Sequence, residues 1–266
     1  MVNLRNVGVE SKINPLSRTV VHVSLRVLDV SGNAQEIGTA SGVIRTRMGL
    51  NYLITALHVL TGGERGGKPG LKHPPNQILI EGFYSKWERN LYEGANDPYS
   101  DRPLYWKNPN SPGVDVGILP LRSGPKSNCS LHETFFNPTN NEASSLYVMQ
   151  ECYIVGFPYG LVDRTDPNLP LPIWKTGHIA SEPFTDFQGQ PKVLIDGLTR
   201  PGQSGAPVFV GSINYRGKFE VTRFVGIYAG REKAISRSTP DGEYWDLGYV
   251  FKPIVVEEIF TANLTS

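Results

Sequence analysis

Short runs of β-branched and aromatic residues recur along the chain, and Gly, Pro, Asn or Asp closes most of them. Such runs between turn-forming residues are typical of β-strands. The pattern predicts strands over Thr19–Leu28, Ile37–Thr46, Asn51–Ala56, Gln77–Phe83, Asp115–Leu121, Tyr147–Phe157, Pro172–Ser181, Lys192–Leu198, Ala206–Val210, Phe219–Tyr228 and Trp245–Phe251. Because no segment of helical period separates them into βαβ units, we expect an all-β barrel or sandwich.

Three segments depart from this pattern. Pro253 opens a C-terminal segment whose apolar residues fall on one face of a helix, which predicts a helix over residues 253–262. The stretches Gly62–Asn76 and Tyr84–Pro112 are rich in Gly, Pro, Asn and charged residues. We interpret both as long surface loops, which often carry recognition rather than packing.

A polar stretch with few strand signals lies between Leu121 and Leu146. If the chain forms two barrels, the seam between them falls here. The single domain then divides into an N-terminal unit of about residues 15–122, a C-terminal unit of about residues 146–252 and the terminal helix.

The overall charge excludes some partners. Lys plus Arg number 26 and Asp plus Glu number 25, so no net field favours nucleic acid or an anionic membrane surface. No apolar run is long enough to span a bilayer, and the N-terminus has no pattern of a signal peptide. The two cysteines, Cys129 and Cys152, cannot form a disulfide framework, although one bridge between them is conceivable. These features predict a cytoplasmic protein.

The segment Pro201–Phe209 holds the first candidate for chemistry, Ser204. A nucleophilic serine needs a tight turn that directs backbone N–H groups toward a developing oxyanion. Gly202 and Gly205 permit such a turn, because glycine tolerates positive φ and close approach of a substrate. Taken alone, the segment is also compatible with a plain β-turn.

His58 and Asp115 are candidate partners of this serine. His58 follows an apolar run, which would place its imidazole at the lip of a barrel, although a single histidine there is compatible with a plain buried side chain. Asp115 lies inside an apolar run, where a carboxylate must be hydrogen-bonded or paired. It could cap a turn or hold an imidazole in one tautomer.

The order of these residues discriminates between architectures of serine hydrolases. An α/β-hydrolase needs its histidine after the serine, and the last histidine here is His178. The subtilisin order needs an aspartate before the histidine, and only Asp29, in a predicted turn, precedes His58. The order His58, Asp115, Ser204 remains.

TALH at 55–58, VDVGIL at 114–119 and GQSGAPVF at 202–209 resemble the three signature blocks of chymotrypsin-like (trypsin-like) serine peptidases. Weaker blocks at 38–42, 155–160 and 176–179 resemble bacterial trypsin-like peptidases, including those of HtrA type. The resemblance implies two six-stranded antiparallel β-barrels with a C-terminal α-helix. Val59 stands where secreted digestive members have a bridging cysteine, Gln203 stands where they have aspartate, and no PDZ-like segment follows the predicted helix.

The resemblance also implies a mechanism without metal or cofactor. Ser204 would attack the scissile carbonyl, His58 would take its proton, and Asp115 would orient the imidazole. The backbone N–H groups of Gly202 and Ser204 would form the oxyanion hole. No His/Cys/Asp/Glu cluster has the spacing of metal ligands.

A specificity pocket follows from the same resemblance. Its floor would be Leu198, six residues before the nucleophile, and its walls would come from Tyr228, Ala229, Gly230 and Gly248. An apolar floor predicts an uncharged P1 side chain of small or medium size. His178 could line a pocket or be a plain strand residue.

These features predict a serine endopeptidase that acts on protein or peptide substrates. They also suggest a regulatory role and a regulatory partner protein. The alternatives are a non-catalytic binding module of the same fold and an esterase-like acyl hydrolase. The filled triad positions favour an enzyme over the binding module, and the strand 227–230, suited to pairing with a peptide backbone, favours peptide substrates.

Overall fold

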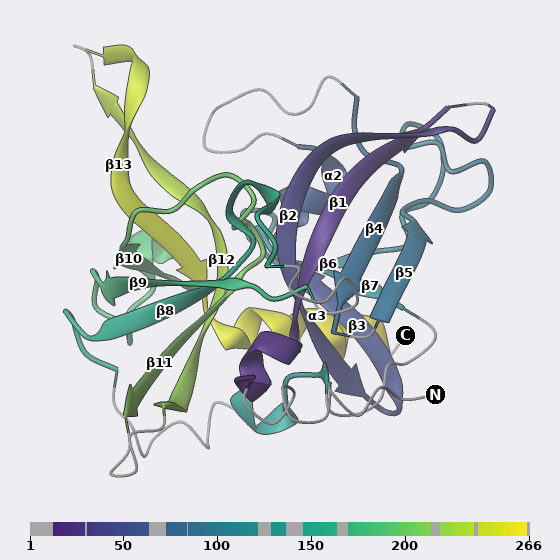
Figure 1. Cartoon of the computed structure of the whole chain (residues 1–266). Coiled ribbons are helices and arrows are strands. Elements are labelled where there is room, and N and C mark those ends of the chain that lie inside the picture. Colours follow the sequence, from purple (N-terminus) through teal and green to yellow (C-terminus); the bar gives the residue numbers. More distant parts are fainter. Residues whose placement is uncertain are drawn as a thin grey trace.

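A computed structural model of the 266-residue chain describes residues 13–29, 31–63, 73–83, 85–121, 129–136, 146–163, 170–213, 219–236 and 239–264. Within these ranges two β-rich halves lie side by side, and the C-terminal helix runs beneath them in the view of Figure 1. The N-terminal half carries the purple and blue strands and the C-terminal half the teal, green and yellow ones.

The N-terminal half is a seven-stranded antiparallel sheet with the order β5-β4-β1-β2-β3-β7-β6. Its strands are β1 (Val20–Leu28), β2 (Ala34–Arg47), β3 (Leu50–Thr55), β4 (Gln77–Gly82), β5 (Ser85–Asn90), β6 (Trp106–Lys107) and β7 (Gly117–Pro120). Consecutive residues 20–25 of β1, 40–45 of β2 and 51–55 of β3 are buried, and because neighbouring side chains of a strand point to opposite faces, both faces of the sheet are covered there.

The prediction of a closed six-stranded barrel is wrong for this half. Its edge strands β5 and β6 form no ladder with each other, and a single bridge between Tyr92 and Pro103 joins the segments beside them. At this bridge Glu93 donates its N–H to the carbonyl of Arg102 and Leu104 donates its N–H to the carbonyl of Leu91, and among the described residues no ladder longer than this bridge joins the two edges. The sheet therefore curls into a half-barrel.

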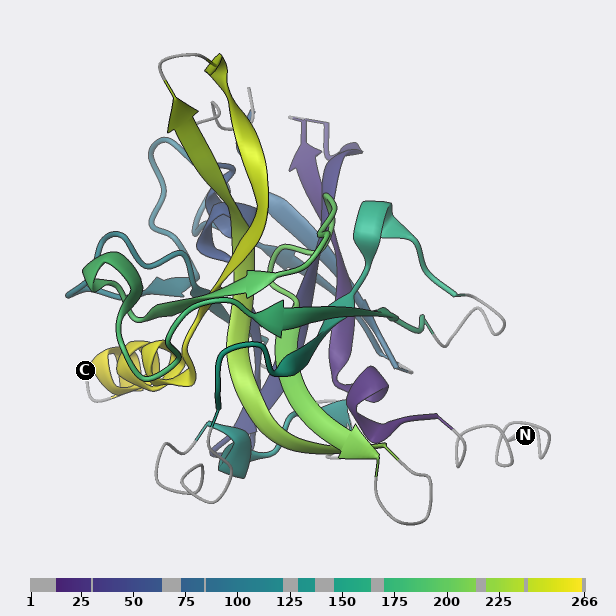
Figure 2. The same cartoon turned by 90° about the vertical axis from the view of Figure 1, so that its left-hand side faces the viewer.

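The C-terminal half is a closed antiparallel barrel of six strands, which confirms the prediction for this part of the chain. Its order is β10-β13-β12-β11-β8-β9, and β9 pairs with β10 to close it. The strands are β8 (Glu151–Gly156), β9 (Ile173–Ile179), β10 (Lys192–Asp196), β11 (Pro207–Ile213), β12 (Phe219–Ser236) and β13 (Thr239–Phe251). Both views show the hairpin of β12 and β13 projecting beyond the barrel (Figures 1 and 2).

The interpretation of Tyr84–Pro112 as one long loop is also wrong, because this stretch contains β5 and β6. Only Trp87 of β5 is buried, and the strand otherwise carries polar and charged residues, so its sequence resembles a loop. Much of the other predicted loop, Gly62–Asn76, lies outside the described residues.

The helix α3 (Pro253–Leu264) joins the two halves. It follows the last strand of the C-terminal barrel, yet its Phe260 ring packs edge-on against Tyr52 of β3 at a centroid distance of 4.9 Å. Glu257 of α3 forms ion pairs with Arg45 and Arg47 of β2. The end of the C-terminal half therefore covers the N-terminal sheet, as the helix beneath both halves shows in Figure 1.

The remaining elements are short. They are the helix α2 (Leu57–Thr61) and the 3-10 turns η1 (Pro15–Arg18), η3 (Glu133–Phe135), η5 (Pro158–Gly160) and η6 (Phe187–Gly189). Among the described residues, no helix has both the length and the apolar character to span a bilayer.

Both cysteines are free thiols, so the conceivable bridge between them is absent. Cys152 lies in the core of the C-terminal barrel, and burial raises the pKa of its thiol to about 12. Cys129 donates a weak hydrogen bond to the carbonyl of Phe83 in the N-terminal half.

Candidate active site

Pairing between β3 and β7 brings His58 and Asp115 together. Thr55 at the end of β3 faces Gly117 at the start of β7. His58 follows Thr55 within one turn, on α2, and Asp115 lies in the segment just before Gly117. His58 therefore lies on the short helix α2 after β3, and the antiparallel pairing of β3 with β7 brings it close to the carboxylate of Asp115.

Asp115 holds His58 by two hydrogen bonds. Its Oδ1 accepts from the backbone N–H of His58 at 2.8 Å, and its Oδ2 lies 2.7 Å from His58 Nδ1. The carboxylate is thus satisfied in its partly buried position, as a carboxylate within an apolar segment must be. Because an ionised carboxylate only accepts, the short contact assigns the ring proton to Nδ1. The second ring nitrogen, Nε2, is buried and has no hydrogen-bond partner among the described residues, so it is available as a proton acceptor.

Ser204 lies in a chain reversal made of two consecutive turns. The N–H of Gln203 donates to the carbonyl of Arg200 at 3.2 Å, and the N–H of Ala206 donates to the carbonyl of Gln203 at 2.9 Å. The third position of each turn is a glycine with positive φ, 92° at Gly202 and 83° at Gly205. Pro201 at the second position of the first turn completes the residue preferences of a type II turn.

Contacts with the N-terminal sheet place this reversal beside α2. Ser41 of β2 donates its N–H to the carbonyl of Ser204 at 2.8 Å. A Cβ atom on Gly205 would overlap Thr55 Oγ1 and the carbonyl of Ser41. Thr55 is the last residue of β3, and His58 follows it on α2. The serine turn therefore packs against the end of the strand that positions His58.

The peptide between Pro201 and Gly202 has a fixed orientation. Its carbonyl, on Pro201, accepts from the N–H of Tyr159 at 2.6 Å. In a planar trans peptide the N–H points opposite the carbonyl, so the Gly202 N–H points away from the Tyr159 backbone. The carbonyl of Gly202 accepts in turn from Ser41 Oγ at 2.8 Å. The backbone around the expected oxyanion donor is therefore held on both sides.

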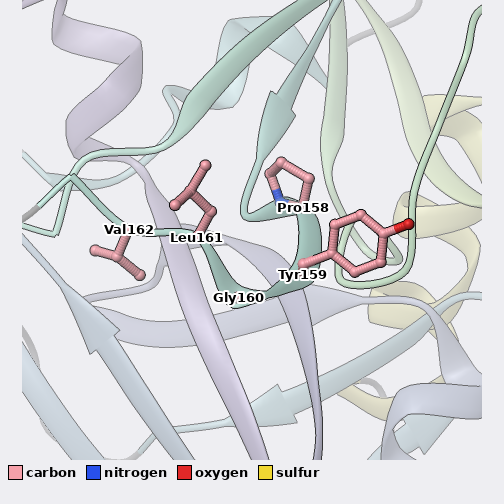
Figure 3. Close-up of a pocket in the computed structure, with 5 residues that line it drawn as sticks. All are labelled: Pro158, Tyr159, Gly160, Leu161 and Val162. Atoms are coloured by element: carbon pink, nitrogen blue, oxygen red, sulfur yellow. The ribbon is translucent and has the colours of Figure 1, made fainter.

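The segment that holds this peptide forms a tight turn. Tyr159 has φ 53°, an uncommon value for a residue other than glycine, and Gly160 follows with φ 69°. Residues 158–162 line a surface hollow of about 530 Å³. Figure 3 shows the ring of Tyr159 on one side of this turn and Leu161 and Val162 on the other.

Comparison with known proteins identifies the family of the chain. The family model described as the trypsin-like peptidase domain matches residues 40–213, a range that includes His58, Asp115 and Ser204. The chain belongs to this family. No curated protein matches the sequence.

One solved structure shows the same fold, and a second is reported beside it. An inactive form of a serine-to-alanine mutant of Rv3671c from M. tuberculosis H37Rv has a TM-score of 0.51 and 14% identity, covering 94% of this chain and 89% of that one. The active form of the Rv3671c protease has a TM-score of 0.48 and 16% identity, covering 98% and 86%. At such identities the likeness extends to the fold of this trypsin-like peptidase and no further.

The predicted pocket residues of this trypsin-like peptidase divide into two groups. Ile227 of β12 pairs with Phe251 of β13, and this ladder places Tyr228, Ala229 and Gly230 beside the strand that carries Gly248. Leu198, in contrast, does not form a buried floor. Its side chain is 49% exposed, and its carbonyl accepts from Lys175.

Sequence reasoning missed two residues that contact the site. Thr199, which is fully buried, occupies the inward position next to Leu198. Ser41, in the weak block 38–42, bridges the two halves through its hydroxyl, which also accepts from the N–H of Phe157 at 2.9 Å. The signal for Ser41 was present in the small residues around it, but its partners lie more than a hundred residues away in the chain.

His178 and Lys175 are two further titratable residues of the C-terminal barrel. His178 on β9 pairs with Glu151 of β8 on one side and with Asp196 of β10 on the other. Within the described ranges, no group of three His, Cys, Asp or Glu residues could hold a metal ion. Lys175 has its pKa lowered, first by burial and then by the nearby charge of Arg200.

Proposed function

We propose that this trypsin-like peptidase is a serine endopeptidase in which Ser204 is the nucleophile, His58 the general base and Asp115 the residue that orients the base. The observation that carries the proposal is the 2.7 Å contact between His58 Nδ1 and Asp115 Oδ2, which leaves Nε2 as the acceptor nitrogen. Proton transfer from a serine hydroxyl requires this tautomer.

The proposed reaction uses the backbone for charge stabilisation. Ser204 Oγ attacks the scissile carbonyl while His58 Nε2 takes its proton and then passes it to the leaving amine. The N–H groups of Gly202 and Ser204 bind the oxyanion, and loss of one such donor costs about 3–4 kcal/mol in the barrier. The hydrogen bonds at Pro201 and Gly202 support this role, because they hold the peptide before the reaction begins.

Peptide substrates fit this arrangement better than simple esters. The strand β12 pairs with the serine turn through Tyr228 and continues past the site, so an extended substrate could add to it as a further strand. We further propose an uncharged P1 preference and a selective, regulatory role on a partner protein in the cytoplasm. The free thiols of Cys129 and Cys152 support a reducing compartment.

Labelling with a fluorophosphonate probe tests the proposal. We expect the wild type to be labelled and Ser204→Ala to be unlabelled, with unchanged circular dichroism and thermal unfolding. Ser100→Ala, which removes an exposed hydroxyl bound to Asp97, is the matched control and should be labelled like the wild type. An unlabelled wild type would support the binding module, and peptidase activity in Ser204→Ala would contradict the assignment of the nucleophile.

Comparing the hydrolysis of peptides with the hydrolysis of short acyl esters tests the remaining alternative, an esterase-like acyl hydrolase. A peptidase should release new N-termini from protein substrates, measurable by mass spectrometry. An esterase-like enzyme would be labelled by the probe and hydrolyse esters while leaving peptides intact.

A further inference from the structure

One aromatic side chain occupies the space beside the proposed nucleophile. Tyr228 of β12 accepts from the N–H of Gly205 at 2.8 Å and donates its own N–H to Ala206 at 2.9 Å. Its backbone therefore lies immediately next to the turn of Ser204. A P1 side chain would have to enter the region between this strand, the segment before the serine and the strand of Gly248.

The hydroxyl of Tyr228 reaches the segment before the serine. Its Oη lies 2.5 Å from Thr199 Oγ1, and both residues are buried, Tyr228 with 2% and Thr199 with none of its surface exposed. Burial of the two hydroxyls is tolerated because one donates a hydrogen bond to the other. Moving the ring away would leave the Thr199 hydroxyl without this partner and would open a cavity, so the closed arrangement is favoured.

The ring also reaches the opposite wall. A Cβ atom placed on Gly248 would lie 2.6 Å from Tyr228 Cε2, so the glycine at this position makes room for the ring. The ring of Tyr228 thus occupies the space beside Gly248, where the resemblance places a pocket wall.

We propose that Tyr228 determines specificity by filling the inner part of the primary pocket, which restricts P1 to small side chains such as those of glycine, alanine and serine. This inference rests on the proposed peptidase function and deepens it. Tyr228, anchored by Thr199, takes the part that the sequence assigned to Leu198, whose side chain points to solvent by its exposure. The residue limits the volume available to the substrate and takes no part in the chemical step.

A peptide library varied at P1 tests the proposal on the full chain. We expect the wild type to cleave after alanine at least about tenfold better than after leucine or phenylalanine, by kcat/KM, since each misfitting group in a pocket costs roughly 10–200-fold. Tyr228→Val should lower the ratio of kcat/KM after alanine to kcat/KM after leucine or phenylalanine by about tenfold or more, because the smaller side chain opens the pocket. Tyr228→Phe is the matched control, since it removes the hydrogen bond to Thr199 but retains the ring, and it should keep the preference for small residues.

The outcomes distinguish this inference from the proposed function. A wild type that the fluorophosphonate probe labels but that prefers phenylalanine or leucine at P1 would overturn the inference and leave the peptidase intact. The same holds if folded, labelled Tyr228→Val keeps the wild-type profile. Failure of the wild type to react with the probe would instead overturn the peptidase proposal itself. If thermal unfolding shows that Tyr228→Val does not fold, the wild-type profile and Tyr228→Leu, which retains more buried volume, decide the question.

Discussion

The N-terminal half-barrel and the C-terminal barrel position their parts of the candidate site by different kinds of contact. In the N-terminal half, a carboxylate side chain binds the ring and the backbone of His58. In the C-terminal half, Ser204 is placed by turns whose two glycines have positive φ. One half therefore depends on the identity of side chains, and the other on a backbone path that few residues can follow.

This difference predicts different consequences of substitution. Exchanging a functional group in the N-terminal half should change chemistry and leave the fold, because the strands around it do not depend on that group. Adding even one methyl group in the serine turn should disturb the packing of the two halves, because Gly205 lies against Thr55 and Ser41 of the other half.

Asp115→Asn should have the largest effect on activity. The amide can still accept from the His58 N–H, but its NH₂ group facing Nδ1 favours the tautomer with the proton on Nε2, which cannot accept a proton from serine. We expect kcat to fall about 10⁴-fold, with a thermal unfolding midpoint close to that of the wild type. Steady-state kinetics and calorimetry measure the two effects. A loss of activity that parallels a loss of folded protein would contradict the comparison.

Gly205→Ala should destabilise the protein. Its φ of 83° disfavours alanine, and the new Cβ would overlap atoms of Thr55 and Ser41. We expect the free energy of unfolding to fall by about 3 kcal/mol, measured by urea denaturation.

Gly32→Ala is the matched control for this variant. Gly32 has nearly the same φ, 81°, but nothing lies within 4 Å of the position of an added Cβ. It should cost only the strain of the backbone, about 1–2 kcal/mol. Equal losses in the two variants would show that the contact between the halves contributes nothing.

Ser41→Ala should lower both stability and activity by a smaller amount, because Ser41 of the N-terminal half bonds to the backbone of the C-terminal half. The variant loses the hydrogen bond to the Gly202 carbonyl and leaves the Phe157 N–H without its acceptor, which costs about 1–3 kcal/mol of stability. As a positioning residue for the oxyanion peptide, Ser41 should affect kcat more than KM, by about tenfold.

Ser17→Ala provides the comparison for Ser41→Ala. It also removes a buried hydroxyl that accepts a hydrogen bond across the halves, from Trp174 Nε1 at 2.9 Å, but it does not contact the serine turn. We expect reduced stability with unchanged kcat. A Ser41→Ala variant that behaves in the same way would reduce Ser41 to a structural role.

Local features of the fold were predictable wherever short-range chemistry dominates. The six strands of the C-terminal barrel follow from β-branched runs closed by turn residues, and α3 follows from its apolar face behind Pro253. The sequence did not predict β5, because only one of its side chains, Trp87, is buried. The strand is instead defined by its antiparallel pairing with β4. The failure of the N-terminal sheet to close is visible only in the tertiary structure, where a single bridge between Tyr92 and Pro103 joins the segments beside its two edges.

The sequence by itself determined that His58, Asp115 and Ser204 are the candidate catalytic residues. Their order along the chain and the glycines on either side of Ser204 can be seen without the tertiary structure. Only the tertiary structure decided what surrounds them. The contact of His58 with Asp115 depends on the register of β3 with β7. Tyr228 is buried beside Gly248 and Thr199, whereas Leu198 is half exposed, because the ladder of β12 and β13 sets the ring of Tyr228 against Gly248. These contacts join residues that are far apart along the chain, and no local sequence pattern predicts them.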